Sequence, residues 1–289
     1  MFKPRPKQAD VLAYTGGWMG VSAVPGSGKT TTLYALAAQL VAQGDLRDDQ
    51  EVLVVTLVNS AVDNFARQVA AFVKQRGLLP GFGYRVRTLH GLANDIVRDR
   101  PALLGLEDGF QIVDEREADD ILLSAVTTWL KNNPTAGENY LSRDFDENKA
   151  QIVLRDRWPN EALNIARAFI KQAKDSELPP EEVARGLERF GMPLPLAEMG
   201  HAIYVNYERG LRYRGAVDFQ DLIRHALRAL QMDADFLRRL HDKWPYVLED
   251  EAQDSSRLQE KILRLLVGER GNWVRVGDPN QSIYETFTT

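Results

Sequence analysis

Short apolar runs that lead into amphipathic stretches occupy two separated parts of the chain. Four runs are predicted to be buried β-strands: residues 19–24, 51–58, 244–248 and 273–276. The first two precede apolar residues at helical spacing, from 29 to 41 and from about 60 to 74. Strands that alternate with helices indicate a parallel sheet covered by helices on both faces. The predicted fold class is therefore α/β.

The middle of the chain has a different pattern. From about 98 to 215, β-rich runs largely vanish, and amphipathic stretches such as 115–130 and 161–174 dominate. Asparagine- and proline-containing turn signals separate these stretches. We therefore expect an all-helical subdomain at 98–215, inserted into an α/β domain formed by 1–97 and 216–289.

Composition narrows the class of protein only a little. The chain has no cysteine, which excludes disulfides and thiolate metal sites and fits a reducing cytoplasm. No run approaches the roughly 20 apolar residues that span a bilayer, and residues 1–10 carry no apolar signal segment. We expect a cytoplasmic protein with no membrane partner. The net charge of -5 argues against a passive nucleic-acid coat but not against a motor with a local DNA groove.

A glycine-rich turn joins the first predicted strand to the helix after it. Its sequence has the pattern and the context of a phosphate-binding P-loop, and it supplies the expected nucleotide-binding residues: Ala23, Val24, Pro25, Gly26, Ser27, Gly28, Lys29, Thr30 and Thr31. Small residues let backbone N–H groups and the helix N-terminus approach phosphate oxygens. Lys29 is expected to reach the β- and γ-phosphates of ATP, and the Thr30 hydroxyl to bind Mg²⁺. A glycine turn that happens to contain a lysine is the alternative, which the flanking strand and helix disfavour.

An acidic segment follows the third of these runs, where a P-loop enzyme needs carboxylates. Asp250 is expected to hold Mg²⁺, and Glu251 to act as the base for the attacking water. A solvated acidic loop is the alternative, but a buried strand directly before the segment makes it the weaker interpretation.

The order of further motifs resembles the first half of the UvrD/Rep-type superfamily 1 DNA helicases. Five segments carry the resemblance beside the P-loop: 56–61 (motif Ia), 88–91 (motif Ib), 217–222 (DFxDL), 250–254 (DExQD) and 277–284 (GDxxQSIY). DExQD followed by GDxxQSIY is highly specific for this family. Gln8 stands where the family has its adenine-reading glutamine.

The resemblance implies a RecA-like ATP-binding domain (1A) with a helical insertion (1B), cofactors ATP and Mg²⁺, and catalytic roles for Lys29, Asp250, Glu251 and Gln281. Gln281 would contact the γ-phosphate and link it to the DNA site, with Gln253 and Asp254 in the same network. The implied DNA-binding residues are Asn59, His90 and Tyr284. The implied substrates are single-stranded DNA and single-strand/duplex junctions, with 3′ to 5′ movement.

The sequence ends at Thr289, directly after the GDxxQSIY motif. The family's remaining motifs lie in a second RecA-like domain, which closes over ATP and donates arginine fingers. We therefore expect the 289 residues to bind Mg-ATP weakly, hydrolyse it slowly and not unwind duplex alone. Two alternatives remain open: the motor part of a RecB/AddA-like helicase–nuclease, and a truncated, non-enzymatic ATP- and DNA-binding module.

Cations near aromatic residues give two further candidate strand-binding groups. The first lies between residues 85 and 100: Arg85, Arg87, His90, Arg98 and Arg100. The second alternates arginines with tyrosines: Tyr204, Tyr207, Arg209, Arg212, Tyr213 and Arg214. A solvated helix face with its tyrosines in the core explains the second group equally well. Trp129 and Trp158 are expected in the core of the insertion.

Overall fold

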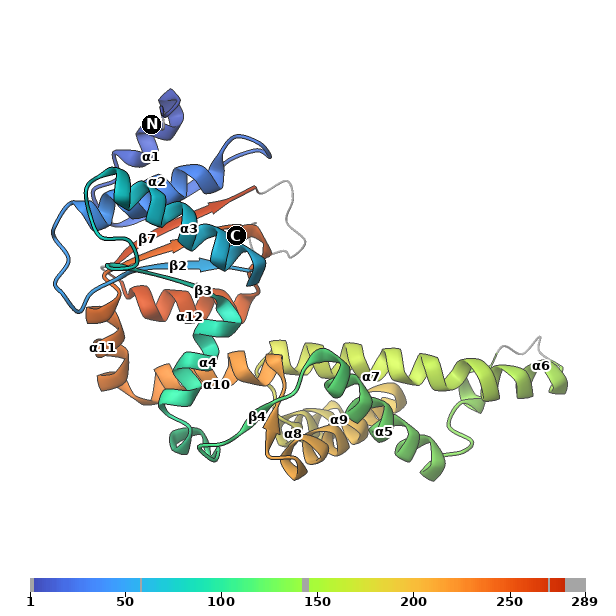
Figure 1. Ribbon diagram of the computed structural model, residues 1–289. Coiled ribbons are helices and arrows are strands. Elements are labelled where there is room, and N and C mark those ends of the chain that lie inside the picture. The colour runs from blue at the N-terminus through green and yellow to red at the C-terminus, as the bar shows by residue number, and fades with distance from the viewer. Residues whose placement is uncertain (1–2, 58, 142–145, 270, 279–289) are drawn as a thin grey trace. The chain divides into compact units, whose positions relative to one another are not determined.

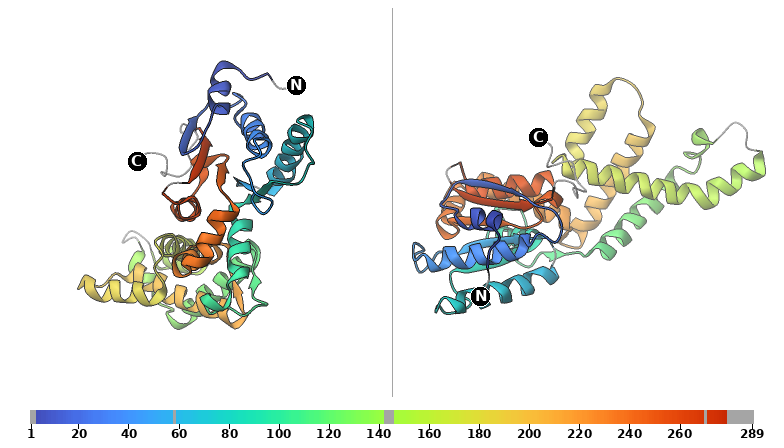
Figure 2. Two further views of the ribbon diagram at one scale, coloured as in Figure 1. Left: turned by 90° about the vertical axis from the view of Figure 1, so that its left-hand side faces the viewer. Right: turned by 90° about the horizontal axis from the view of Figure 1, so that it is seen from above.

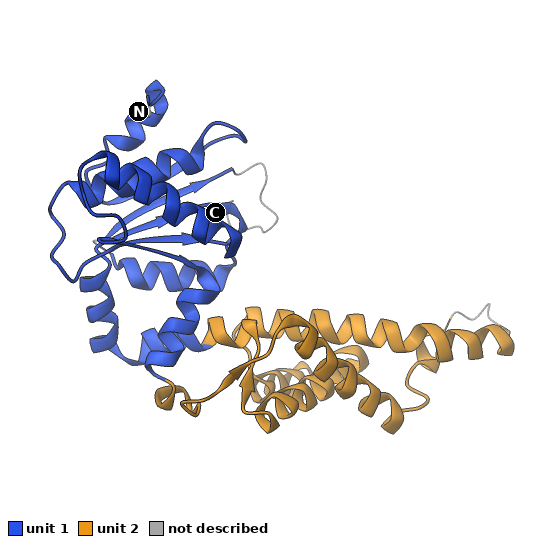
Figure 3. Cartoon of the chain, in the orientation of Figure 1, with its two compact units in different colours: residues 1–100, 225–289 blue, residues 101–224 orange. Residues whose placement is uncertain are grey.

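A computed structural model describes residues 3–57, 59–141, 146–269 and 271–278. The chain forms two compact units (Figure 3): a sheet unit, Met1–Arg100 with His225–Thr289, and a helical unit, Pro101–Arg224. The predicted domain boundaries follow residues 97 and 215. These units divide after residue 100, at the end of α4 (Leu89–Asp99), and after residue 224, within α10 (Phe219–Met232).

The sheet unit is built on five parallel strands, as the α/β fold class requires. Their spatial order is β1 (Trp18–Ser22), β7 (Asn272–Gly277), β6 (Tyr246–Glu249), β2 (Val52–Thr56) and β3 (Tyr84–Thr88). Strand β2 is buried along its whole length, whereas the edge strand β3 alternates between buried and half-buried residues. This difference follows from position, because a central parallel strand is covered on both faces.

Helices cover both faces of this sheet (Figure 1, Figure 2). Helices α2 (Lys29–Ala42) and α3 (Asn59–Gln75) lie on one face, and α12 (Arg257–Val267) lies on the other. The remaining helices among the described residues of the unit are α1 (Pro6–Leu12), α4, α11 (Ala234–Lys243), most of α10 and the short 3-10 helix η4 (Ala252–Asp254). Because the strands are parallel, the loops that follow their carboxyl ends all lie at one edge of the sheet.

The helical unit packs α5 (Glu115–Asn132), α7 (Trp158–Asp175) and α9 (Pro195–Tyr213) around a core that contains Val126, Ala166 and Tyr204. Its other segments are η1 (Ala102–Leu104), η2 (Glu138–Tyr140), α6 (Glu147–Ile152), the π-helical turn η3 (Val153–Arg157) and α8 (Pro180–Phe190). A two-residue parallel pair, β4 (Gln111–Ile112) with β5 (Ala216–Val217), adds a small strand element. Strands this short carry no periodic signal, so the sequence could not show them. Trp129 and Trp158 pack against the core as expected.

A buried ammonium organises the DFxDL element of the helical unit. Lys174 has no exposed surface, and its Nζ donates to Asp218 Oδ2 at 2.6 Å and to Asp221 Oδ2 at 2.7 Å. Glu208 Oε1 lies 3.1 Å from the same nitrogen. The polar residues of DFxDL therefore join α7, α9 and the start of α10 inside this unit.

Among the described residues, no helix has the length and apolar content needed to cross a membrane.

Candidate functional site

The P-loop wraps around the N-terminus of α2 in a conformation that requires glycine. Gly28 is the N-cap of α2 with φ +87°, in the left-handed region. Its carbonyl accepts the Thr32 N–H at 3.0 Å and the Thr32 hydroxyl at 2.8 Å. Gly26 also has a positive φ, of 71°. The loop backbone and the first turn of α2 form the arrangement that binds phosphate in many proteins.

Gln8 reaches this loop from α1. Its Nε2 donates to the Ser27 carbonyl at 3.1 Å, and its Oε1 accepts the Arg5 N–H at 2.9 Å. A Cβ placed on Gly28 would lie 2.7 Å from Gln8 Nε2, so the two residues are packed together. Ser27 Oγ is buried and has no hydrogen-bond partner among the described residues. The adenine-reading role of Gln8 stays a prediction, but the structure places it on the loop.

Asp250 stands at the end of β6, next to the P-loop. Its N–H donates to the Val55 carbonyl at 2.9 Å, and its carboxylate accepts a hydrogen bond from the Thr30 side chain. Burial, followed by the charge of Glu251, raises the pKa of Asp250 to about 6. Asp250 Oδ1 is buried without a hydrogen-bond partner in the described part of the chain. A hydroxyl and an unsatisfied carboxylate oxygen side by side fit Mg²⁺, which prefers oxygen ligands.

Glu251 adopts a backbone conformation that is rare for a residue with a side chain. Its φ is +53°, and such left-handed positions cost about 1–3 kcal/mol and gather at functional sites. Lys29 Nζ donates to Glu251 Oε2 at 3.1 Å, and the Lys29 side chain is 7% exposed. The lysine expected at the phosphates and the carboxylate expected to act as base are therefore direct partners here.

Gln253 links the acidic loop to the end of β7. Its Nε2 donates to Glu251 Oε2 at 2.8 Å and to Asp254 Oδ2 at 3.1 Å, while its Oε1 accepts the Asp278 N–H at 3.0 Å. The side chain is buried. One amide thus orients Glu251 and fixes its loop to the strand that carries the GDxxQSIY motif. The sequence named Gln253 only through the family resemblance and did not identify the Asp278 N–H as its partner.

The expected DNA-contacting residues are only partly covered by the structure. Asn59 is the exposed first residue of α3, after β2, and His90 lies in the first turn of α4, after β3. Both therefore lie at the same sheet edge as the P-loop. Burial lowers the pKa of His90, which favours its neutral form. Gln281 and Tyr284 lie outside the described residues.

The arginines of the first cationic group have intramolecular partners. Arg85 Nε pairs with Glu51 and Arg87 Nε with Asp95, each at 2.8 Å. Arg98 Nε donates to an Asn94 oxygen at 2.9 Å, and Arg100 Nε pairs with Asp233 at 3.0 Å. Alternating cations on an edge strand and its helix are here held by nearby polar partners, which the sequence pattern could not reveal.

In the second cationic group the tyrosines separate into two kinds. Tyr204 and Tyr207 are buried core residues of the helical unit, while Tyr213 is 92% exposed. The arginines that alternate with them are exposed. The tyrosine-in-core interpretation therefore holds for two of the three tyrosines.

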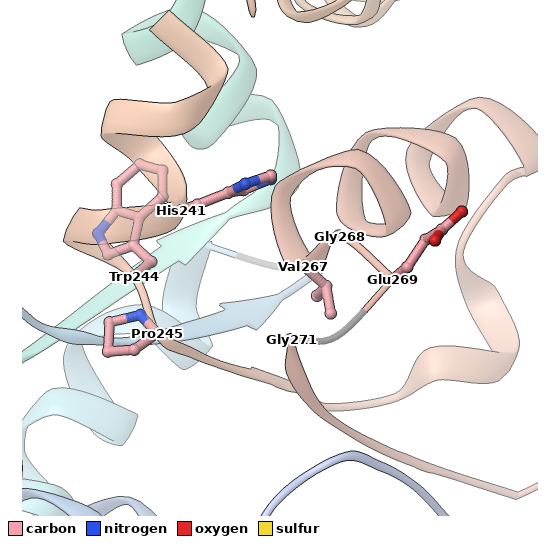
Figure 4. A pocket seen from close by; sticks show the side chains of 7 residues that line it. All are labelled: His241, Trp244, Pro245, Val267, Gly268, Glu269 and Gly271. Atoms are coloured by element: carbon pink, nitrogen blue, oxygen red, sulfur yellow. The ribbon is translucent and has the colours of Figure 1, made fainter. Parts of the chain in front are cut away.

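A cavity of about 630 Å³ lies at the opposite, amino-terminal end of the strands (Figure 4). Its lining comes from the segments that precede β6 and β7: His241, Trp244, Pro245, Val267, Gly268, Glu269 and Gly271. His241 Nε2 is bonded to the Leu265 carbonyl at 2.7 Å, which supports a structural role for this histidine. The cavity is thus separate from the P-loop site.

Comparison with known proteins finds one matching family model and several relatives. A family model described as the UvrD/REP helicase N-terminal domain matches residues 5–286. A probable DNA helicase II homolog of Rickettsia felis is 27% identical over 281 residues, covering 96% of this chain and 38% of that protein. The ATP-dependent DNA helicase PcrA of Leuconostoc citreum is 28% identical over 278 residues, covering 96% and 33%. DNA helicase II of Escherichia coli is 26% identical over 278 residues, covering 96% and 34%. The chain spans about a third of the length of these curated relatives.

Proposed function

The chain belongs to the UvrD/REP helicase N-terminal domain family, and on that premise we propose that it is the ATP-hydrolysing part of a DNA helicase. The observation that carries the proposal is the meeting of three groups at one sheet edge. They are the P-loop with Lys29, the unsatisfied carboxylate oxygen of Asp250, and Glu251 beside Lys29. These are the groups that phosphoryl transfer to water requires.

The residues divide the chemistry among themselves. ATP phosphates entering the loop draw Lys29 Nζ away from Glu251, because phosphate oxygens carry more negative charge than one carboxylate. The released Glu251 carboxylate takes a proton from water as the water oxygen bonds to the γ-phosphorus. The bond between that phosphorus and the β,γ-bridging oxygen breaks, giving ADP and phosphate. Mg²⁺ held by Thr30 and Asp250 would neutralise charge on the β- and γ-phosphates.

The remaining parts of the proposal concern DNA. Asn59, His90 and Tyr284 contact a single strand near a duplex junction, and Gln281 links those contacts to the γ-phosphate. A second RecA-like domain closes over ATP, and the cycle of closing and opening moves the protein 3′ to 5′ in the cytoplasm. Family membership supports these roles, and so does the position of Asn59 and His90 at the P-loop edge.

Substitution of the proposed base tests the assignment. Glu251→Gln is expected to preserve ATP binding and to slow single-turnover hydrolysis by at least about 100-fold, the usual contribution of a general base. Glu188→Gln, on an exposed part of α8, is the matched control and should match the parent protein. Hydrolysis in Glu251→Gln at the parent rate would show that another group is the base.

A further inference from the structure

An ion pair joins the neighbouring strands β6 and β7, and it faces α12, because Arg275 also lies near Glu260 of that helix. Helix α12 covers the sheet face opposite α2 and α3 (Figure 2). Glu249 on β6 and Arg275 on β7 are directly opposite each other in the strand register. Arg275 Nε donates to Glu249 Oε2 at 2.8 Å, and Arg275 Nη2 donates to Glu249 Oε1 at 3.5 Å. Glu249 is 1% exposed, so the pair lies inside the unit.

Two further contacts extend the pair to the neighbouring segments. The Ser255 hydroxyl donates to Glu249 Oε1 at 2.7 Å, and Arg275 Nη1 lies 3.4 Å from Glu260 Oε1 on α12. Burial raises the pKa of Glu249, and the charge of Arg275 opposes that rise. The carboxylate therefore holds strand β7 and the end of the acidic loop at the same time.

The position of this pair relative to the candidate site is specific. Glu249 directly precedes Asp250, and side chains at adjacent strand positions point to opposite faces. Ser255 closes the loop that begins at Asp250, and Arg275 is three positions before Asp278. The loop is thus fixed to β7 twice, by Glu249 with Arg275 and by Gln253 with the Asp278 N–H.

A role in stability alone does not account for an ion pair at this place. Apolar side chains of similar volume often give equal or greater stability than a buried ion pair. What apolar contacts lack is direction, since burial of apolar surface is not directional. Two hydrogen bonds from Arg275 to Glu249, with a third from the Ser255 hydroxyl, fix both the register and the orientation of the strand end.

We propose that Glu249 and Arg275 are positioning residues that hold Asp250 and Glu251 in register with the end of β7. The proposal rests on the ATP-hydrolysing function proposed above and adds to it two residues that touch neither nucleotide nor metal. Their effect is exerted through the backbone of the acidic loop.

The test replaces both partners at once, so that no unpaired charge remains. Glu249→Met with Arg275→Met removes the pair and takes the acceptor from Ser255. The matched control is Glu51→Met with Arg85→Met. In that pair Arg85 Nε donates to Glu51 Oε2 at 2.8 Å, and the same carboxylate oxygen accepts a hydrogen bond from Trp244 Nε1 at 3.3 Å. It lies at the amino-terminal end of β2, away from the P-loop edge.

Three quantities are measured on the 289-residue protein: the melting temperature, ATP affinity with and without Mg²⁺, and the single-turnover hydrolysis rate. The Glu249/Arg275 double variant is expected to melt near the parent temperature and to bind Mg²⁺-free ATP as the parent does. Its Mg²⁺-dependent gain in affinity and its hydrolysis rate should each fall roughly 10-fold or more, the scale of a small misplacement of catalytic groups. The Glu51/Arg85 variant should keep both.

A double variant with the parent Mg²⁺ gain and the parent rate overturns the positioning role. Equal losses in the two double variants also overturn it, because they show a general loss of structure. Failure of the proposed function looks different. In that case the parent protein itself would bind no ATP, or would bind it equally well after Lys29→Ala.

Discussion

At the scale of single residues, Lys174 shows how strongly a buried charge depends on its partners. Burial alone would lower its pKa, but Asp221, Asp218 and Glu208 outweigh burial and raise that pKa. A lysine with a raised pKa in the folded state contributes stability that is fully present at neutral pH. That stability is lost only as the pH rises through the raised value. Burial raises the pKa of Glu208, and the positive charge of Lys174 opposes that rise.

Lys174→Met is therefore expected to destabilise the helical unit by about 3–5 kcal/mol near neutral pH, because buried carboxylates lose their counter-charge. The loss should shrink at about pH 5, because the folded variant can then bind a proton at Glu208, whose pKa is raised by burial. Urea unfolding at the two pH values measures it. Lys171→Met, at an exposed position of α7, should change stability by less than about 0.5 kcal/mol. A pH-independent loss in Lys174→Met would contradict this account.

At the scale of elements, helix α2 has a left-handed glycine at each end with different surroundings. Gly28 begins the helix with φ +87° and contacts Gln8. Gly44 follows the helix with φ +76°, and a Cβ there would meet no atom within 4 Å. The backbone strain of a substitution is comparable at the two ends, but only one end faces the nucleotide site.

Gly28→Ala and Gly44→Ala should each lose about 1–2 kcal/mol of stability, the cost of the left-handed conformation for alanine. Only Gly28→Ala should also lose ATP affinity, by roughly 10-fold or more, since its methyl group displaces the Gln8 amide from the loop. Thermal unfolding and calorimetric ATP titration separate the two effects. Equal ATP affinity in both variants would show that the Gln8–Gly28 packing does not shape the site.

At the scale of the whole molecule, the described residues contain one five-stranded parallel sheet and a helical unit. The relatives are about three times as long as the matched region. An arginine finger from a second domain contributes on the order of 10³–10⁵ in rate where it has been measured. The chemistry of Glu251 is therefore proposed to need a partner domain for full speed.

The purified 289-residue protein is expected to bind ATP, to hydrolyse it at least about 10³-fold more slowly than a complete helicase, and to show no stimulation by single-stranded DNA. Phosphate release with and without an oligonucleotide measures this, and Lys29→Ala supplies the background rate. DNA-stimulated turnover at ordinary helicase rates would contradict the expectation and the proposed dependence on a second domain.

The sequence by itself determined the α/β fold class, the P-loop and the acidic segment. Each of these is a contiguous strand–loop–helix pattern, whose meaning depends on residues only a few positions apart. The sequence could place Gly28, Lys29 and Thr30 on one turn between a strand and a helix because that turn is local, and for the same reason it could place Asp250 at the end of its strand.

Only the tertiary structure decided which distant side chains meet. Glu249 and Arg275 are separated by 26 positions, and Gln253 and Asp278 by 25. Lys174 and Asp218 are separated by 44. These pairs depend on the order of the strands and on the helix that covers each face, which no local pattern contains. The same reason explains why the arginines near β3, which suggested a DNA groove, proved to be held by intramolecular partners.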